Sequence, residues 1–405
     1  MNKIYLDINK YSQYVITGEI GILGKNSLNK ITLRRINAEY VNDSILISFA
    51  EETKINIFER IEYMAKTSNI SLEMKEAVNA LLINYKNEQK DFQEFSNKAK
   101  NIREDKFQDN PELIKEFEDF TDVLNNALVR KLYKRQLLSA YHMAFSQNSC
   151  NFAVPGAGKT SIVYGAYAYL KSLSVDDPKH VDKLLVIGPL SSFDPWEKEY
   201  KDCFGIFPES QRLSGNSPGN YGASIAVTML QKENHLYSRS PKELTIMNYS
   251  ALQFITDKVK DFLNQNKVMV IVDEAHRIKN TEGVWGQAAI EIAKEANSRI
   301  VLTGTPAPNG YEDLFNLIQF IYPYKFREIM RTNNAQLRDM TRSNLSIEND
   351  RVKNFVENIK PFFIRINKKE LNLPEPIESE ERVEMDTLQR KIYDYVFNLF
   401  SPHFE

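Results

Sequence analysis

The spacing of apolar residues changes twice along this chain. Over residues 4–58, β-branched and aromatic residues alternate with polar ones, as in Ile31-Thr-Leu and Ile45-Leu-Ile-Ser-Phe. Alternation with a period of two residues is typical of strands that bury one face. We therefore predict a small β-rich domain over residues 1–66.

A helical period follows. From Ser71, with Glu73 in the first turn, apolar residues recur three and four positions apart, at Met74, Val78, Leu81 and Leu82. A second helix is expected to begin at Asn110-Pro111, because asparagine caps helices and proline suits the first helical position. Residues 67–126 are thus predicted to form a helical stalk that packs against the next domain. The alternative is a coiled coil through which this N-terminal region binds a partner protein.

From about Leu132, short apolar runs alternate with amphipathic stretches. These runs include Leu184-Leu-Val-Ile, Val268-Met-Val-Ile-Val and Arg299-Ile-Val-Leu. Runs that are apolar on both faces belong in parallel sheets covered by helices. The sequence therefore predicts an α/β fold over residues 127–325, a parallel sheet with helices on both faces. A helical insertion is expected over residues 326–360 and a connecting segment over residues 361–405.

Composition narrows the class of protein. Hydrophobic residues make up 42% of the chain and charged residues 26%, as in ordinary globular domains. The 52 basic residues nearly balance the 54 acidic ones, so a nucleic-acid surface must be a local patch. No apolar stretch reaches the roughly 20 residues that cross a bilayer, and the first residues lack the apolar run of a signal peptide. A cytoplasmic protein without a membrane contact is expected.

The segment Ala153-Val-Pro-Gly-Ala-Gly-Lys-Thr160 has the composition of a phosphate-binding loop. Its glycines let backbone N–H groups turn toward phosphates, and the following helix offers its positive N-terminus. Lys159 is expected to bind the β- and γ-phosphates, and the Thr160 hydroxyl to hold Mg²⁺. The residues expected to surround the phosphates are Pro155, Gly156, Ala157, Gly158, Lys159 and Thr160.

An apolar strand ending in two carboxylates, Val270-Ile-Val-Asp-Glu-Ala-His276, supplies a second motif. Asp273 would complete the Mg²⁺ site, and Glu274 would orient and deprotonate the attacking water. Two acids after a strand can also be the N-terminal acids of a helix. The phosphate-binding loop upstream favours the catalytic interpretation.

A third motif, Leu302-Thr-Gly-Thr-Pro306, also follows an apolar strand. Its hydroxyls can hydrogen-bond to Asp273 or His276 and so sense the state of the γ-phosphate. The residues expected to couple the nucleotide to other parts of the protein are His276, Thr303, Gly304 and Thr305.

Together these strings resemble the motifs of the SNF2 family of DNA translocases. Asp273-Glu-Ala-His-Arg-Ile-Lys-Asn280 is similar to that family's motif II, and Thr303-Gly-Thr-Pro-Ala-Pro-Asn309 to its motif III. Gly188-Pro-Leu-Ser191 is similar to motif Ia, and Thr245-Ile-Met-Asn-Tyr249 to the strand before the next DNA-contacting loop. The resemblance implies a RecA-like lobe that uses ATP and Mg²⁺ and acts on double-stranded DNA. It also implies DNA contacts at Ser191, Tyr249 and Asn309.

Gln136 matches the glutamine that such ATPases place upstream of the phosphate-binding loop. A glutamine amide can pair with both the N6 donor and the N7 acceptor of adenine. The aromatic residue usual just before it is replaced by Arg135, so Arg135 or Tyr133 would stack on the base. The alternative is that Gln136 is an ordinary surface residue of a helix.

SNF2 motors use a second RecA-like lobe, in cis or in trans, and its motifs do not occur before Glu405. We expect either a piece of a longer protein or a naturally short product. An arginine from the second lobe is worth roughly 10³ to 10⁵ in rate. The chain alone is therefore expected to hydrolyse ATP near background.

The expected activity of the parent protein is ATP-dependent translocation on duplex DNA, in remodelling, repair, restriction or antiphage defence. The start of the phosphate-binding loop favours a bacterial source. The alternative is a nucleotide-gated module that binds DNA or protein without turnover. The intact Glu274 favours catalysis, whereas the missing second lobe favours the module.

Overall fold

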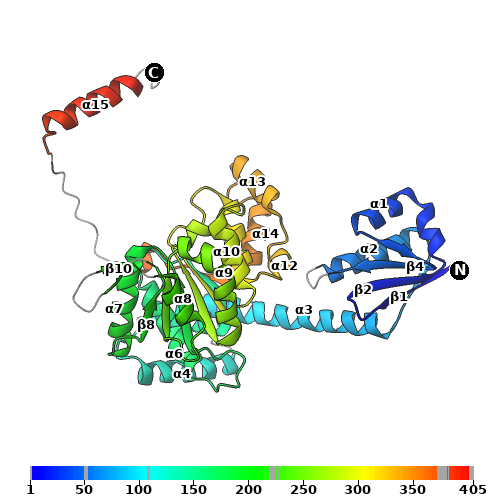
Figure 1. Ribbon diagram of the computed structural model, residues 1–405, viewed down its shortest axis with the longest axis horizontal. Coiled ribbons are helices and arrows are strands. Elements are labelled where there is room, and N and C mark those ends of the chain that lie inside the picture. The colour runs from blue at the N-terminus through cyan, green and yellow to red at the C-terminus, as the bar shows by residue number, and fades with distance from the viewer. Residues whose placement is uncertain are drawn as a thin grey trace. The chain divides into compact units, whose positions relative to one another are not determined.

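The computed structural model describes residues 2–49, 53–106, 110–214, 216–218, 224–226, 228–371, 381 and 383–400. The chain divides into one unit over residues 1–367 and a second over residues 368–405. The first unit contains an N-terminal sheet domain, a long helix and a larger α/β lobe (Figure 1).

The N-terminal domain is a five-stranded sheet with two helices. The strands run in the order β3-β4-β2-β1-β5, and β5 pairs with β1 in parallel. The elements are β1 Lys3–Ile8, β2 Gln13–Gly18, α1 Ser27–Arg35, β3 Glu39–Val41, β4 Ser44–Ser48, α2 Lys54–Thr67 and β5 Ser71–Met74. Alternate residues of β1, β2 and β4 are buried and form one core with the inner face of α2.

Two sequence predictions in this domain were wrong. Ile31-Thr-Leu lies in helix α1, whose N-cap Asn26 accepts a hydrogen bond from the backbone N–H of Leu28 at 2.9 Å. Ser71, expected at the start of a helix, begins strand β5 instead, and the helix starts at Glu76. The open edge of β1 offers β5 a full set of backbone partners, and this long-range pairing outweighs the local helical spacing.

Two helices follow the sheet domain, α3 Glu76–Arg103 and α4 Pro111–Ala127. The predicted start of α4 is confirmed, because the Asn110 side chain accepts hydrogen bonds from the N–H groups of Glu112 and Leu113 at 3.1 and 3.2 Å. The C-terminal part of α3 packs on the lobe, where the Phe95 ring stacks on Phe145 with 5.5 Å between centroids. These contacts favour a packed stalk.

The lobe is built on a seven-stranded sheet in the order β14-β6-β13-β12-β7-β11-β8, and every neighbouring pair is parallel. Its strands are β6 Asn148–Asn151, β7 Lys183–Ile187, β8 Ser210–Arg212, β11 Leu244–Met247, β12 Val268–Asp273, β13 Ser298–Leu302 and β14 Phe363–Ile364. A separate short hairpin joins β9 Asn216–Pro218 to β10 Ser224–Ala226.

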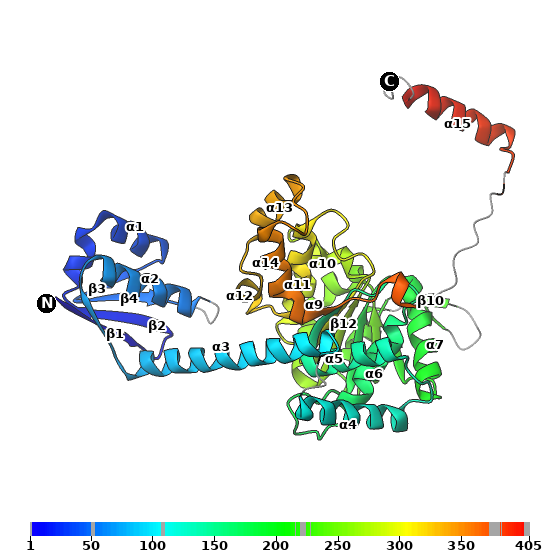
Figure 2. The same ribbon diagram turned by 180° about the vertical axis from the view of Figure 1, so that it is seen from behind.

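Helices cover both faces of this sheet (Figures 1 and 2). They are α5 Lys134–Ser146, α6 Lys159–Ser172, α7 Phe193–Phe204, α8 Met229–Leu236, α9 Tyr249–Gln265, α10 Val284–Ala293 and α11 Leu314–Ile321. The central strands β7, β11 and β12 are buried at nearly every position, as expected for a sheet covered on both sides. The predicted α/β fold class is confirmed.

The expected helical insertion contains α12 Phe326–Met330, α13 Asn334–Arg342 and α14 Asp350–Ile359. Their apolar residues join the same core as α9, α10 and α11. The segment after them, predicted as a connector, first contributes β14 to the sheet through pairing with β6. The second unit includes helix α15 Thr387–Phe400. Within the described residues, no helix is long and apolar enough to span a membrane.

Candidate functional site

The phosphate-binding loop joins β6 to α6. Gly156 and Gly158 have φ angles of 84° and 77°, a left-handed conformation that side-chain-bearing residues rarely adopt. Lys159 opens α6, and its Nζ donates to the carbonyl oxygen of Ala153 at 3.2 Å. The ammonium group therefore lies over the loop, beside the positive N-terminus of a helix. This combination of backbone donors and a fixed cation suits a bound phosphate chain.

Gln136 reaches this loop from helix α5. Its Oε1 accepts from the backbone N–H of Tyr133, and its Nε2 donates to the carbonyl of Ala157, both at 3.0 Å. A Cβ atom at position 158 would lie 2.3 Å from this Nε2, which is a second reason for Gly158. Gln136 therefore connects the start of α5 to the phosphate-binding loop. Tyr133, a candidate for stacking on adenine, is 79% exposed, and Arg135 is also exposed.

Asp273 ends the central strand β12. Its Oδ2 accepts from the indole Nε1 of Trp196, and its Oδ1 from the backbone N–H of Glu274, both at 3.0 Å. Burial raises the pKa of this carboxyl group. Gly188 lies beside it, since a Cβ atom there would come within 3.3 Å of the Asp273 Cβ.

The donors around this edge of the sheet fit Mg²⁺. Asp273 supplies a carboxylate, and the half-buried Thr160 at the start of α6 supplies a hydroxyl. Across the ranges that the structure describes, no group of three or more His, Cys, Asp or Glu residues could hold a metal. Mg²⁺ typically takes one or two protein oxygens and completes its shell with substrate phosphates and water. Thr160 and Asp273 match that pattern.

Glu274 adopts a left-handed conformation with φ of 52°, unusual for a residue with a side chain. Its carboxylate Oε2 lies 3.3 Å from Nδ1 of His276, and its side chain is 40% exposed. The sharp turn separates the two acids: Asp273 points into the lobe, whereas Glu274 keeps an accessible carboxylate at the strand end. Such backbone outliers cluster at functional sites.

The third motif packs against the phosphate-binding loop. The Thr303 N–H donates to the carbonyl of Asn151 at 3.2 Å, which extends the pairing of β13 with β6. A Cβ atom at Gly304 would lie 3.0 Å from Cδ of Pro155, so only glycine fits there without a shift. The Thr303 hydroxyl accepts from the N–H of Thr305 at 3.2 Å. The Thr303 hydroxyl therefore forms a hydrogen bond within its own loop. The sequence had led us to expect a bond to Asp273 or His276.

Two of the three expected DNA contacts lie on the surface. Ser191 and Asn309 are exposed, in the loops that follow β7 and β13. Tyr249 is only 2% exposed, and its hydroxyl donates to the backbone carbonyl of Asp273. This burial leaves no tyrosine surface for DNA. Tyr249 instead supports the backbone of the acidic motif through this hydrogen bond.

Trp196 is a site residue that sequence reasoning missed. The sequence predicted a core position, and the residue is indeed 1% exposed, but its N–H holds the Asp273 carboxylate. Its backbone carbonyl accepts from the Tyr164 hydroxyl at 2.7 Å, which ties α7 to α6. Hydrophobic spacing locates a buried tryptophan but does not reveal its hydrogen-bond partner.

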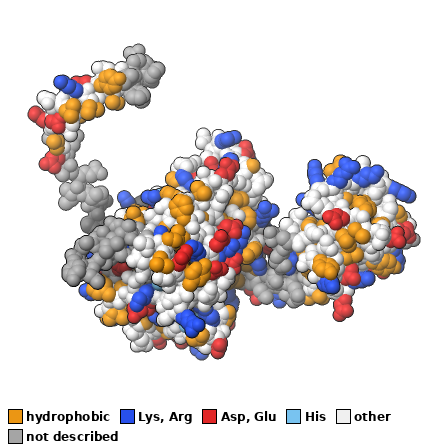
Figure 3. All heavy atoms as spheres, in the orientation of Figure 1, with side chains coloured by type: hydrophobic (Ala, Val, Ile, Leu, Met, Phe, Trp, Pro, Cys, Tyr) orange, Lys and Arg blue, Asp and Glu red, His pale blue; other side chains and the backbone are white. Residues whose placement is uncertain are grey.

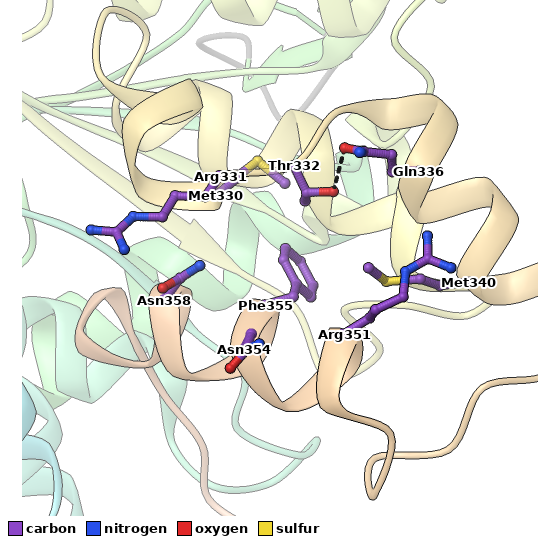
Figure 4. A pocket seen from close by; sticks show the side chains of 9 residues that line it. All are labelled: Met330, Arg331, Thr332, Gln336, Met340, Arg351, Asn354, Phe355 and Asn358. Carbon is purple, nitrogen blue, oxygen red and sulfur yellow. Dashed lines mark hydrogen bonds between the residues drawn. The ribbon is translucent and has the colours of Figure 1, made fainter.

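A separate cavity of about 500 Å³ lies in the helical insertion (Figure 4). Its floor includes the Phe355 ring, and the Thr332 hydroxyl donates to Oε1 of Gln336 at 3.0 Å at its rim. None of the motif residues lines it. It is therefore distinct from the phosphate-binding loop.

A parallel sheet whose strand ends carry these three motifs defines a P-loop nucleotide-binding lobe of the RecA type. The chain belongs to the SNF2-related family, because the profile of the "SNF2-related domain" matches residues 61–401.

Similar proteins agree with this family. Human "Chromodomain-helicase-DNA-binding protein 1" is 28% identical over 255 residues, which cover 62% of this chain and 14% of that protein. A Drosophila melanogaster "SWI/SNF-related matrix-associated actin-dependent regulator of chromatin subfamily A containing DEAD/H box 1 homolog" is 27% identical, covering 61% and 28% of the two chains. The chain thus spans less than a third of either relative.

Among solved structures, the "Sulfolobus solfataricus SWI2/SNF2 ATPase core in complex with dsDNA" is 21% identical, with a TM-score of 0.46. The match covers 68% of this chain and 54% of that one.

Proposed function

We propose that this chain is the ATP-binding motor lobe of an SNF2-type translocase that moves on double-stranded DNA. One observation carries the proposal: four motifs far apart in the sequence lie at the ends of neighbouring parallel strands. Gly304 fits against Pro155 of the phosphate-binding loop, and Gly188 fits against Asp273. Membership of the SNF2-related family supports ATP as the nucleotide.

Each side chain has a role in this proposal. Lys159 and the backbone donors of the loop bind the phosphates of ATP, and Gln136 with Tyr133 or Arg135 holds the adenine. Thr160 and Asp273 hold Mg²⁺, which neutralises charge on the transferring phosphate when bound. Glu274 orients the attacking water and accepts its proton.

The third motif couples the nucleotide to the DNA track. Gly304 contacts the phosphate-binding loop directly, whereas Asn309 in the same loop reaches the surface. A shift of the loop on hydrolysis would therefore move a surface side chain. His276, beside Glu274, and the two threonines Thr303 and Thr305 would transmit the same change.

The expected setting is the bacterial cytoplasm, in remodelling, repair, restriction or antiphage defence. Duplex DNA would lie over Ser191 and Asn309, and a second RecA-like lobe, in cis or in trans, would close over the γ-phosphate. The names of two relatives, a chromodomain-helicase-DNA-binding protein and a regulator of chromatin, support DNA as the substrate class.

Phosphate release with and without a long duplex tests this function. We expect turnover near background from the 405 residues alone, because the transition-state arginine would come from the second lobe. Adding that lobe should produce DNA-stimulated hydrolysis. Glu274→Gln is the control: it should retain ATP binding while the stimulated rate falls by about 10² or more.

The outcomes separate the proposal from its rival, a nucleotide-gated module without turnover. ATP-dependent DNA binding without hydrolysis, even with the second lobe present, would favour the module. Strong DNA-stimulated turnover by the chain alone would show that self-association or the N-terminal domain supplies the transition-state arginine.

A further inference from the structure

Helix α1 of the N-terminal domain carries an unneutralised basic surface. Between Glu19 and Glu39 the chain contains four basic residues and no acidic one. These residues form what we call the α1 basic surface: Lys30, Arg34 and Arg35 of α1, with Lys25 at the end of the 3-10 helix Ile20–Lys25 that precedes it. All four side chains are exposed, and within the described part of the chain none makes an ion pair. Figure 3 shows Lys and Arg side chains gathered where α1 lies.

Two other cations of the same domain are paired with carboxylates across the sheet. Lys3 lies 2.5 Å from Glu73, and Lys75 lies 3.3 Å from Asp7. With net charge near zero over the whole chain, a run of uncompensated cations is a local feature and not a consequence of overall composition.

The fold fixes which way this helix faces. Asn29 and Leu33 are buried, and the Asn29 amide donates to the Ser68 hydroxyl at the end of α2 at 2.7 Å. The opposite side therefore points outward. Leu28 and Ile31, which are 70% and 49% exposed, lie among the cations there and offer apolar contact beside the charges.

We propose that the α1 basic surface binds the phosphate backbone of the duplex DNA on which the motor acts. That the ligand is DNA rests on the proposed function. That the surface prefers a polyanion rests on the charge of the surface itself. The surface lies outside the region that matches the SNF2-related profile, which begins at residue 61. It would give the protein a second DNA contact, independent of the motor lobe.

The length of α1 suits the spacing of phosphates along duplex DNA. A helix of nine residues is about 13 Å long. Phosphates of one DNA strand are spaced about 3.4 Å apart along the duplex axis, so the surface spans about four of them. Two of the cations are arginines, whose planar guanidinium groups pair with phosphate in a bidentate manner. Such contacts add affinity without reading base sequence.

The test compares two triple variants of the full chain that change net charge equally. One removes part of the surface: Lys30→Gln, Arg34→Gln and Arg35→Gln. The matched control removes three other exposed cations of the same domain: Lys10→Gln, Arg60→Gln and Lys66→Gln. Duplex binding is measured by fluorescence anisotropy across a salt series without nucleotide, and circular dichroism verifies folding.

We expect the α1 variant to lose at least about tenfold in affinity at low salt. Its plot of log affinity against log salt should become shallower by about 2 to 3, since each phosphate contact contributes about 0.9. The control should keep the wild-type slope, and nucleotide binding should be unchanged in both variants.

Several results would overturn the inference. Equal losses in both variants would mean that overall charge is responsible, and no loss in either would mean that DNA binds elsewhere, with the proposed function intact. If the wild type binds no duplex at all, the inference and the proposed DNA function both fall. Binding to phosphatidylserine vesicles that depends on the α1 cations, with duplex binding unaffected, would assign the surface to membranes.

Discussion

At the scale of single residues, the Asp273 carboxylate is held from two directions. Trp196 of α7 donates to one oxygen, and the backbone of Glu274 donates to the other. Outer hydrogen bonds of this kind orient a metal-binding group and hold its geometry. Because α7 begins just after the exposed Ser191, the indole links a surface loop to the expected Mg²⁺ position.

Trp196→Phe keeps most of the ring volume but removes this hydrogen bond. We expect Mg²⁺ affinity, measured by calorimetry in the presence of ADP, to fall by about tenfold. Nucleotide binding without Mg²⁺ should change little, because Lys159 and the loop remain.

Trp285→Phe serves as the matched control. Trp285 stacks on Tyr249 with 5.6 Å between ring centroids, so its loss alters packing near the site but removes no bond to Asp273. Unchanged Mg²⁺ affinity in Trp196→Phe, or an equal loss in the control, would contradict the role of the indole.

At the scale of elements, the end of α3 is clamped to the segment that follows α14. Lys360 Nζ lies 2.8 Å from Glu104 and 2.9 Å from Glu357. Beside this network, the Arg103 Nε donates to the Phe363 carbonyl at 2.7 Å, and its guanidinium lies 4.6 Å from the Phe363 ring centroid. The contacts attach the stalk directly to the strand β14.

The clamp has a predictable pH dependence. Hydrogen bonds from Lys360 and Lys106 lower the pKa of Glu104 from 4.5 to about 2. Because the folded pKa is below the unfolded value, Glu104 stabilises the fold above pH 4.5, and this contribution is lost as pH falls toward 2. Glu104→Gln should lower the free energy of unfolding at pH 7 by about 1 to 2 kcal/mol.

Urea denaturation at several pH values provides the measurement. The difference between wild type and Glu104→Gln should shrink as pH falls from 5 toward 3. Glu357→Gln is the matched control. The Glu357 side chain is 52% exposed, and in this variant Lys360 still pairs with Glu104. A surface pair of this kind contributes at most about 1 kcal/mol. A difference for Glu104→Gln that does not vary with pH would exclude the charge network as its cause.

At the scale of the whole molecule, two hydrophobic cores share one helix. Val78 near the start of α3 belongs to the N-terminal core, whereas Phe92 and Phe95 further along α3 pack against the core of the lobe. The residues proposed to contact the nucleotide lie in the lobe. A ligand that binds the folded state stabilises the part that binds it.

We therefore expect two thermal unfolding transitions. Mg²⁺ and ATP should raise the midpoint temperature of the lobe's transition and leave that of the N-terminal domain unchanged. Lys159→Ala should abolish this shift, because the cation over the loop is lost, while the midpoints without ligand stay close to those of the wild type. Lys171→Ala, in the last turn of the same helix, removes a surface cation paired with Glu243 and should keep the shift. Differential scanning calorimetry with and without nucleotide measures the shift in midpoint temperature. A full shift in Lys159→Ala would refute the phosphate-binding assignment.

Features that depend on neighbouring residues could be predicted from the sequence. The phosphate-binding loop, the paired acids of Asp273 and Glu274, and the apolar strands before them are contiguous strings, and their chemistry follows from their order. Strand ends of a parallel sheet meet at one edge, so the convergence of the motifs was predictable too.

Features that depend on which distant segments meet could be seen only in the folded protein. Strand β5 forms because the edge of β1 is free, and β14 enters the sheet because β6 lies beside it. The buried Tyr249 donates to the backbone carbonyl of Asp273, and Trp196 gains its role from a carboxylate 77 positions away. Hydrophobic period is a local property of the chain, whereas the partner of a buried donor or of a sheet edge is fixed only by the packing of distant elements.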